Sequence, residues 1–203
     1  MHRKLLFLLV FTLGLVSTAQ AQTTTSAPRR VHTSPTPFWL PRGVVLGTSY
    51  NDALLTPRLK VQWELTFFQD RKDAFVFLVE GGLGWGARMP TPKAGKPETN
   101  LGAYYEHTAQ VGFGYRNQLP NAAHWGFQVT GGPVFYGAKF DGGPLPDKNV
   151  AGIVEGRIQI GYQFDKVAAG VAVGYGEPFG LKRRYLGRGF VGGPMVGLFM
   201  DWR

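Results

Sequence analysis

From Gly43 onward the chain alternates between hydrophobic and polar positions. In residues 58–69, one parity holds Leu59, Val61, Trp63, Leu65 and Phe67, and the other holds Lys60, Gln62, Glu64 and Thr66. Successive side chains of a strand point to opposite faces, so this period of two predicts β-strands. Eight such segments, separated by clusters of Pro, Gly, Asn and Asp, are predicted strands: 43–50, 58–69, 74–86, 102–116, 124–137, 150–164, 167–176 and 190–202.

The composition of the two faces indicates which of them points inward. The polar parity is rich in glycine and small residues, whereas the apolar parity carries most of the aromatic residues. An eight-stranded barrel has an interior just wide enough for side chains, which suits small and polar groups better than a ring of aromatics. We therefore predict an all-β protein, an eight-stranded antiparallel up-and-down transmembrane β-barrel with apolar residues outside. A soluble barrel with an apolar interior is the alternative.

The segments between the strands support this arrangement. Long segments are expected at 87–101, 138–149 and 177–189, and short ones at 70–73, 117–123 and 165–166. The first segment, 51–57, is the exception to this alternation because it is as short as 117–123. Outer-membrane barrels place long loops on the extracellular rim and tight turns on the periplasmic rim. Aromatic residues, which favour membrane interfaces, are expected near the periplasmic rim at Phe67, Phe75, Tyr115, Trp125, Tyr162, Phe164 and Trp202, and near the outer rim at Trp85, Tyr105, Phe135 and Tyr175.

The N-terminal residues have the features of an export signal. Residues 1–21 combine a basic start, an apolar run over 5–16 and the triplet Ala19, Gln20, Ala21, which predicts a secretory signal peptide cleaved before Gln22. The apolar run is too short to span a bilayer as a helix. Residues 22–42 are rich in proline and threonine and are predicted to be a flexible periplasmic linker, with residues 43–203 forming an outer-membrane barrel.

Composition narrows the function classes further. The 203 residues suit one domain, and the absence of cysteine excludes disulfides and thiolate chemistry. The formal charge of +9 falls to +7 when the signal peptide, with Arg3 and Lys4, is removed. We expect no nucleic-acid partner for an exported barrel, despite its basic composition. The four histidines have no ligand spacing, so neither a metal site nor a cofactor is predicted.

Over residues 43–203 the chain resembles the small eight-stranded outer-membrane barrels of the OmpX and OmpA transmembrane-domain type. The last strand resembles the barrel-assembly signal of that class, with Gly197, Met200 and Trp202, although the chain ends in Arg203 and has Met195 where a polar residue is usual. We expect contacts with outer-membrane lipids, including lipopolysaccharide, handling by the barrel-assembly machinery, and a monomer.

Charged residues gather on the interior parity of the predicted strands. Buried charges are tolerated when they are paired or hydrated. We therefore predict a polar network in the lumen, with an acidic excess, formed by Lys60, Glu64, Glu80, Glu106, Glu155 and Arg157. A porin-like, narrow ion or proton channel is the alternative use of the same residues.

One segment bears on enzymatic activity. Residues 106–110 resemble the strand motif of the outer-membrane lipid A deacylases, in which a histidine and a serine two residues later share the lipid-facing side. His107 has that outward parity and could act as a general base, but Ala109 stands at the position of the nucleophile and has no hydroxyl. We therefore predict that the protein is not an enzyme, with a lipid A-modifying hydrolase as the alternative.

The last long loop carries a basic cluster. Ammonium and guanidinium groups pair with phosphates at a membrane surface, so lipid-headgroup binding is predicted for Lys182, Arg183, Arg184 and Arg188. The function expected from these features is non-enzymatic: contributing to envelope integrity, or presenting surface loops to lipopolysaccharide or other cell-surface partners.

Overall fold

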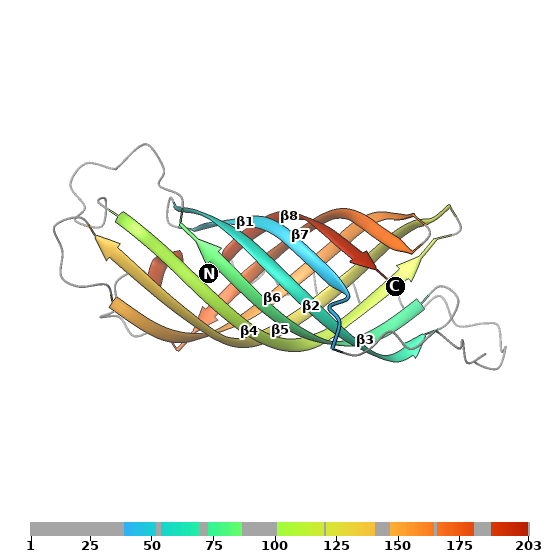
Figure 1. The fold of residues 1–203 in the computed structure, drawn as a ribbon, viewed down its shortest axis with the longest axis horizontal. Helices are drawn as coiled ribbons and strands as arrows, with labels where there is room; N and C mark the ends of the chain where they lie inside the picture. The colour runs from blue at the N-terminus through green and yellow to red at the C-terminus, as the bar shows by residue number, and fades with distance from the viewer. Residues whose placement is uncertain are drawn as a thin grey trace, which may run out of the picture. The chain divides into compact units, whose positions relative to one another are not determined.

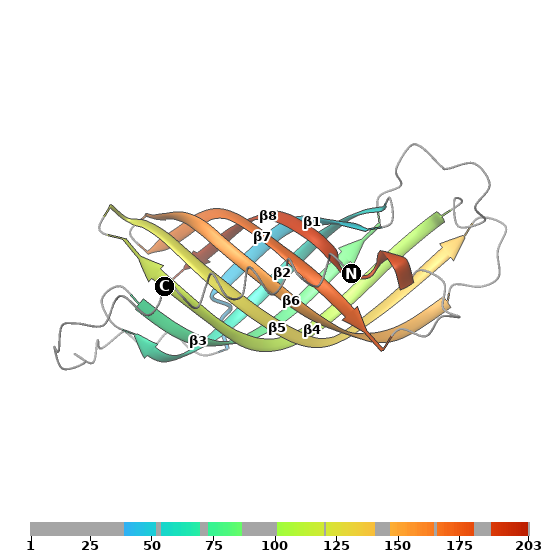
Figure 2. The ribbon, with the colours of Figure 1, turned by 180° about the vertical axis from the view of Figure 1, so that it is seen from behind.

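The computed structural model is a closed barrel of eight strands (Figures 1 and 2). It describes residues 39–51, 54–69, 73–86, 101–119, 121–140, 147–164, 166–180 and 188–202. Each strand pairs antiparallel with the next, and β1 pairs with β8 to close the sheet, which confirms the all-β, eight-stranded, up-and-down barrel. The strands are β1 (Gly43–Asn51), β2 (Leu54–Gln69), β3 (Asp73–Trp85), β4 (Leu101–Gln118), β5 (Ala123–Phe140), β6 (Asp147–Phe164), β7 (Val167–Phe179) and β8 (Gly193–Trp202).

The first connection is shorter than expected. Only residues 52 and 53 separate β1 from β2, so the loop predicted for residues 51–57 is wrong. Pro57 lies inside β2, opposite Thr48 of β1. Pairing between β2 and β3 begins only at Arg58, so the missing N–H of Pro57 interrupts no ladder on that side. Pro57 pairs with β1 but lies before the first residue that pairs with β3. The sequence prediction took this proline as part of a loop, whereas it belongs to the strand.

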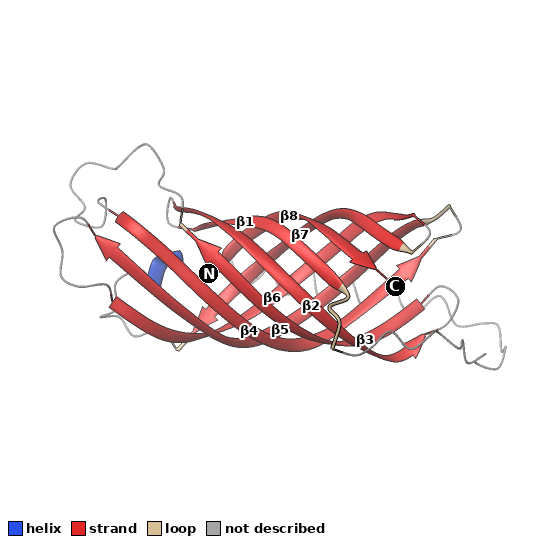
Figure 3. Cartoon of the chain, in the orientation of Figure 1, coloured by secondary structure: helices blue, strands red, loops and turns tan. Residues whose placement is uncertain are grey.

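The start of the last strand also differs from the prediction. Residues 190–192 were expected in a strand, but Arg188–Phe190 form a short 3₁₀ helix, η2 (Figure 3), and β8 begins at Gly193. Gly192 and Gly193 have φ of 79° and 91°, a left-handed conformation that glycine adopts without strain and that ends the extended path. Within the described residues, no helix is long and apolar enough to cross a membrane.

At one end of the barrel, three strands extend beyond the others. We call the end with the connections after β1, β3, β5 and β7 the loop end, and the opposite one the turn end. Strands β4, β5 and β6 have 18 residues each and reach beyond their neighbours at the loop end, on the left of Figure 1. Trp85 at the end of β3 pairs with Tyr105, and Phe179 at the end of β7 pairs with Gly152. We call the part from these pairs to the ends of the three strands, residues 101–105, 136–140 and 147–152, the projecting wall.

The two faces of the sheet have the predicted character. Large apolar side chains are exposed on the outside of every strand; Ile160 and Leu198, for instance, are each 63% exposed. The interior holds buried charged residues such as Lys60 and Glu80. The predicted apolar-out, polar-in arrangement is therefore confirmed, and the alternative with an apolar interior and polar exterior does not describe this barrel.

Aromatic residues lie close together near the turn end. The ring of Tyr115 lies 5.6 Å from that of Trp125, and Tyr162 lies 5.0 Å from Phe164, between ring centroids. The Tyr115 hydroxyl donates to Asp73 at 2.5 Å, so its ring joins the apolar wall while its polar end meets a polar group. The side chain of Phe67 lies outside what the structure describes.

The predicted signal peptide and residues 22–38 of the predicted linker lie outside the described residues. Of the last linker residues, Arg42 continues the path of β1, because its N–H donates to Gln62 and its carbonyl accepts from the Trp202 N–H. The Trp63 indole N–H donates to the Trp39 carbonyl at 3.0 Å. The chain thus reaches the barrel along the outer face of β2.

Candidate functional site

Four of the predicted lumen residues meet in the middle of the barrel, and we call them the central ionic cluster: Lys60, Glu80, Glu155 and Arg157. The Lys60 ammonium lies 2.8 Å from Glu80 Oε1 and 2.6 Å from Glu155 Oε1. The Arg157 guanidinium lies 2.5 Å from Glu80 Oε2 and 3.4 Å from Glu155 Oε1. All four are buried, so two cations and two carboxylates alternate with almost no contact with solvent.

A glycine gives Lys60 room to cross the lumen. Gly82 is the partner of Lys60 on β3, and a Cβ there would meet Lys60 Cγ at 3.3 Å and collide with the Thr108 hydroxyl. Without that side chain, the lysine reaches from β2 to Glu155 on β6, 95 residues away in sequence. The absence of a side chain at Gly82 therefore leaves the space in the lumen that the long side chain of Lys60 occupies.

Amide side chains surround the central ionic cluster. Gln62 donates to Glu80 Oε2 at 2.8 Å, and Gln128 Oε1 accepts from the Arg157 guanidinium at 2.6 and 3.0 Å. Gln110 Oε1 accepts from Thr130 at 3.1 Å and from Lys60 at 3.4 Å. These bonds use donors and acceptors that the ion pairs leave over, as a buried polar network requires.

The other two predicted lumen residues form separate pairs. Glu106 binds Arg58 through two contacts, one of 3.1 Å, and also accepts from the Tyr104 hydroxyl at 2.9 Å. Both carboxylate oxygens of Glu64 accept from Arg116 Nη1, at 2.7 and 2.9 Å. This pair lies nearer the turn end. The structure thus places all six residues inside the barrel but joins only four of them in one cluster.

The acidic excess of these six residues is largely offset by two further cations, although Asp201 on β8 is one more buried acid. Arg58 and Arg116 also face the lumen, so each of the four glutamates has a cationic partner. Arg58 has the same parity as Lys60 and could have been found from it. It is the first residue of the predicted strand 58–69, but the predicted network did not include it. Arg116 has the same parity as Glu106 and Gln110 in its strand, so the period of two could have placed it in the lumen as well.

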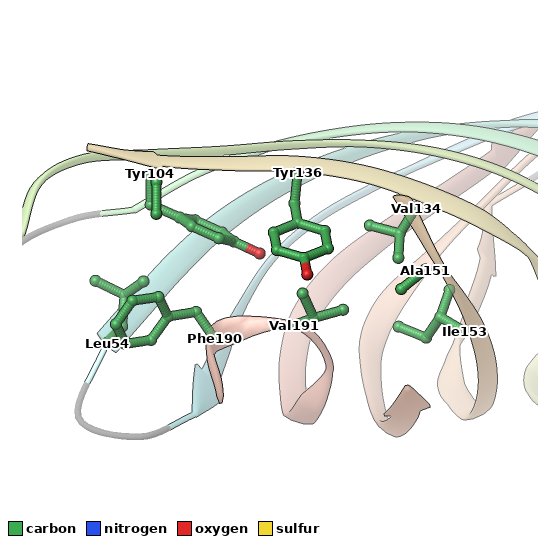
Figure 4. Close-up of a cluster of buried hydrophobic side chains, with 9 residues drawn as sticks. Leu54, Tyr104, Val134, Tyr136, Ala151, Ile153, Phe190 and Val191 are labelled. Carbon is green, nitrogen blue, oxygen red and sulfur yellow. The ribbon is translucent and has the colours of Figure 1, made fainter. Parts of the chain in front are cut away.

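The loop end of the lumen is closed by apolar side chains (Figure 4). We call this the loop-end apolar cluster: Leu54, Tyr104, Val134, Tyr136, Ala138, Ala151, Ile153, Phe190 and Val191. Phe190 packs edge-on against Tyr104 with ring centroids 5.7 Å apart, and the Asn51 amide donates to the Val191 carbonyl at 2.9 Å. Phe190 and Val191, at the end of η2 and just after it, therefore enter the lumen from the loop end, which the strand predicted for 190–202 did not foresee.

The turn end is also filled. Val45, Ala168, Ala172 and Phe199 form one buried cluster, and the His124 ring lies edge-on to Phe199 with centroids 5.3 Å apart. Ala74, Val76 and Leu78 form another. His124 is thus an interior residue packed on an aromatic ring. The described part of the chain holds no group of three potential metal ligands.

His107 lies on the outer wall, as its parity predicts, and is exposed. Its ring lies 5.9 Å from that of Tyr105, and its partners across the ladders are Leu83 and Phe135. Ala109 is the next residue on the same face, so these outer-wall neighbours include no serine or threonine. Ser49, the single serine of the described residues, is buried in the lumen.

The side chains of the predicted lipid-binding residues of the last loop lie outside the described part of the chain. Lys182, Arg183 and Arg184 lie outside the described residues. Arg188 begins η2, but its side chain is likewise outside what the structure describes.

No protein-family model and no curated protein matches the chain. The barrel is similar to the crystal structure of the outer membrane enzyme PagL, with a TM-score of 0.51 and 15% sequence identity over 79% of this chain and 99% of that chain. At this identity the likeness is one of fold. It leaves the question of enzymatic activity open and does not separate the OmpX and OmpA type from other eight-stranded barrels.

Proposed function

We propose that the protein is an integral outer-membrane barrel with a sealed lumen and a non-enzymatic role in the cell envelope. The observation that carries this proposal is the exposure of large apolar side chains on all eight strands, together with the burial of the charged residues inside. A continuous apolar surface of this kind is unfavourable in water and favourable against lipid. The likeness in fold to an outer-membrane protein supports the same location.

The filled lumen supports a structural barrel over a porin-like channel. An ion entering from the loop end meets the loop-end apolar cluster and then the central ionic cluster, whose charges already neutralise one another. Single-channel recording on the purified barrel in planar bilayers is expected to show no conductance steps. Steps that vanish in an Arg157→Gln or Glu80→Gln variant would establish the channel instead.

The surroundings of His107 support the non-enzymatic role. A hydrolase of the type that the segment resembles needs a nucleophile within hydrogen-bond reach of its base, and the neighbours of His107 on the outer wall are Tyr105, Ala109, Leu83 and Phe135. The lipid A-modifying hydrolase remains the alternative, which an altered mass of lipid A in cells that express the protein would favour.

Within this proposal, the barrel contributes to envelope integrity or presents its loop end to lipopolysaccharide or other cell-surface partners. The resemblance to the OmpX and OmpA type, the monomeric state, the barrel-assembly machinery as a biogenesis partner and a periplasmic N-terminal linker belong to the same proposal. Lipid-headgroup binding by Lys182, Arg183, Arg184 and Arg188 is part of it as well.

The first experiment asks whether the apolar wall lies in lipid. The protein is expected in the outer-membrane fraction, with a mobility on detergent gels that changes when the sample is boiled, because closed barrels resist detergent until heated. A protein that stays in the periplasm without detergent and shows no change of mobility would overturn the proposal.

A matched pair of substitutions at different depths in the expected bilayer also tests whether the apolar wall lies in lipid. Leu198 is 63% exposed in the middle of β8, and Phe164 is 59% exposed at the turn end of β6. In a bilayer, Leu198→Arg is expected to lower the free energy of unfolding by about 2–4 kcal/mol and Phe164→Arg by about 0–1 kcal/mol, because the cost of a cation falls toward the interface. Urea titrations in phosphatidylcholine vesicles measure both. Equal costs would contradict a membrane-spanning wall.

A further inference from the structure

We propose that the outer face of the projecting wall binds the phosphate groups of an anionic glycolipid in the outer leaflet, through Lys139, Lys148 and Tyr105. The inference rests on the proposed function, since it requires the loop end of the barrel to stand at the outer surface of the membrane. It differs from the predicted basic loop because its residues belong to strands.

The register of the sheet brings the three side chains together. Tyr105 on β4, Gly137 on β5 and Lys148 on β6 are successive partners across the two ladders, and Lys139 follows two residues after Gly137 on the same face of β5. Both lysines are exposed. The two ammonium groups and the tyrosine are thus carried on adjacent strands of one rigid sheet.

Gly137 lets the tyrosine lean toward the lysines. A Cβ at Gly137 would fall within 2.5 Å of Tyr105 Cζ and of its hydroxyl oxygen, which shows that the ring lies over the glycine. The end of the phenol therefore lies over β5, next to the strand that carries Lys148. Any side chain at position 137 would prevent this approach.

Among the described side chains, no carboxylate neutralises the charge of either lysine. Neither lysine forms an ion pair with a residue that the structure describes. No carboxylate with a described side chain faces outward on β4, β5 or β6. The exposed Glu177 is on β7 and pairs with Val154, six residues or about 20 Å along β6 from Lys148. Within the described part of this surface, an anion would meet two cations and no carboxylate.

The height of the site on the wall points to a lipid headgroup. On β5 the exposed apolar residues end at Phe135, and Lys139 follows four residues or about 13 Å later; on β6 Lys148 stands two residues beyond the exposed Val150. The cations thus lie just outside the apolar band, where the phosphates of an outer-leaflet lipid are found. Ammonium groups and a phenolic hydroxyl are donors that phosphate oxygens accept.

The inner face of the projecting wall keeps the site in place. Tyr104, Tyr136 and Ala151 pack on Phe190 and Val191 in the loop-end apolar cluster (Figure 4). The same strands are therefore packed on one side by apolar residues and carry the two exposed lysines on the other, so the backbone of the site is already ordered before an anion binds.

The test uses the purified protein in detergent and counts bound lipid by native mass spectrometry. Bisphosphorylated lipid A is the probe, and lipid A without phosphates is the comparison. We expect K139Q/K148Q to weaken binding of the bisphosphorylated form about twentyfold, on the basis of about fivefold for each cation near a lipid surface. K166Q is the matched control, because Lys166 is exposed in a turn at the opposite end, and it should bind as the wild type does.

Three further arms keep the result interpretable. K139R/K148R keeps both charges and should retain binding, which separates loss of charge from misfolding; the single variants serve if the double variant does not fold. Y105F should weaken binding about threefold by removing one donor. Excess inorganic phosphate at millimolar concentration should not displace the lipid, and complete displacement would overturn the assignment to a lipid headgroup.

The inference and the proposed function fail in different ways. A protein that is soluble without detergent and shows no heat-modified mobility overturns both. A protein that inserts into phosphatidylcholine bilayers, changes mobility on boiling and binds lipid A equally in the K139Q/K148Q and wild-type forms overturns only the phosphate site. Binding of an acidic protein, abolished by the same substitutions while lipid A binding is unchanged, would also contradict it.

Discussion

The lumen is filled in two different ways along its length. In the central ionic cluster, Lys60, Glu80, Glu155 and Arg157 all come from strands and meet across the barrel. In the loop-end apolar cluster, strand residues pack on Phe190 and Val191, which belong to a segment outside the strands. In the middle of the barrel, side chains of the strands therefore fill the lumen by themselves. At the loop end, where only three strands form the projecting wall, Phe190 and Val191 complete the packing.

The two regions also depend on different forces. Burying an ion pair costs about as much in lost hydration as the pair returns, whereas removing one partner leaves a charge without compensation. Apolar packing is worth a roughly constant amount for each unit of buried area and does not depend on a partner of opposite sign. The comparison predicts a large, cooperative loss in the centre and a moderate, local loss at the loop end.

The largest effect is expected for Arg157→Gln. The substitution leaves Glu80 and Glu155 to share the single charge of Lys60 inside a buried cluster. We expect the free energy of unfolding to fall by about 3–5 kcal/mol, the usual cost of breaking a buried pair on one side. Urea titration of the barrel in phosphatidylcholine vesicles, followed by tryptophan fluorescence, measures the change.

The control for Arg157→Gln removes both partners. In the double variant Glu80→Gln/Arg157→Gln, Glu155 keeps Lys60 and neither substituted amide carries a charge. The double variant should therefore lose less stability than Arg157→Gln alone, with a coupling of about 1–3 kcal/mol. Additive losses would mean that the two side chains do not act as a pair.

A smaller loss is expected for Phe190→Ala at the loop end. The ring is 7% exposed and packs on Tyr104, so its removal leaves a cavity that the surrounding strands only partly fill. The expected fall in the free energy of unfolding is about 3 kcal/mol and should not depend on salt, because no charge is involved. The same vesicle assay at low and high salt checks it. A loss above that of Arg157→Gln would reverse the order of the two regions.

The strands and the direction of their side chains could be predicted from the sequence because a period of two is a property of local neighbours. Lys60, Glu80 and Arg157 were placed in the lumen in this way, and the structure has them there. Their partners could not be predicted, because the register of eight strands decides that Lys60 reaches Glu155 across the barrel. Arg58 lies in the predicted strand 58–69 on the parity of Lys60, so the sequence could have placed it in the lumen, but its pairing with Glu106 also depends on the register.

The loop end was less predictable for a different physical reason. Phe190 and Val191 precede the alternating residues of β8 and were predicted to belong to the same strand, but two glycines with positive φ separate them from it, and both side chains are buried in the loop-end apolar cluster. The projecting wall follows from the different lengths of neighbouring strands, and the position of Tyr105 over Gly137 follows from the register. Neither can be obtained from one strand considered by itself.

The smallest effect is expected for Arg116→Gln. This substitution tests whether burial, rather than the geometry of the ion pair, makes the central ionic cluster sensitive to loss of a partner. Arg116 binds Glu64 through two contacts of 2.7 and 2.9 Å, so its geometry is as good as that of the central pairs, but its side chain is 14% exposed near the turn end. Water can hydrate Glu64 when the arginine is lost, so we expect a fall in the free energy of unfolding of only about 1 kcal/mol. The measurement is the same urea titration, with Arg157→Gln as its reference. Equal costs for the two arginines would mean that water reaches the central ionic cluster as easily as the turn end. The sealed lumen, and with it the contrast between the two regions, would then be contradicted.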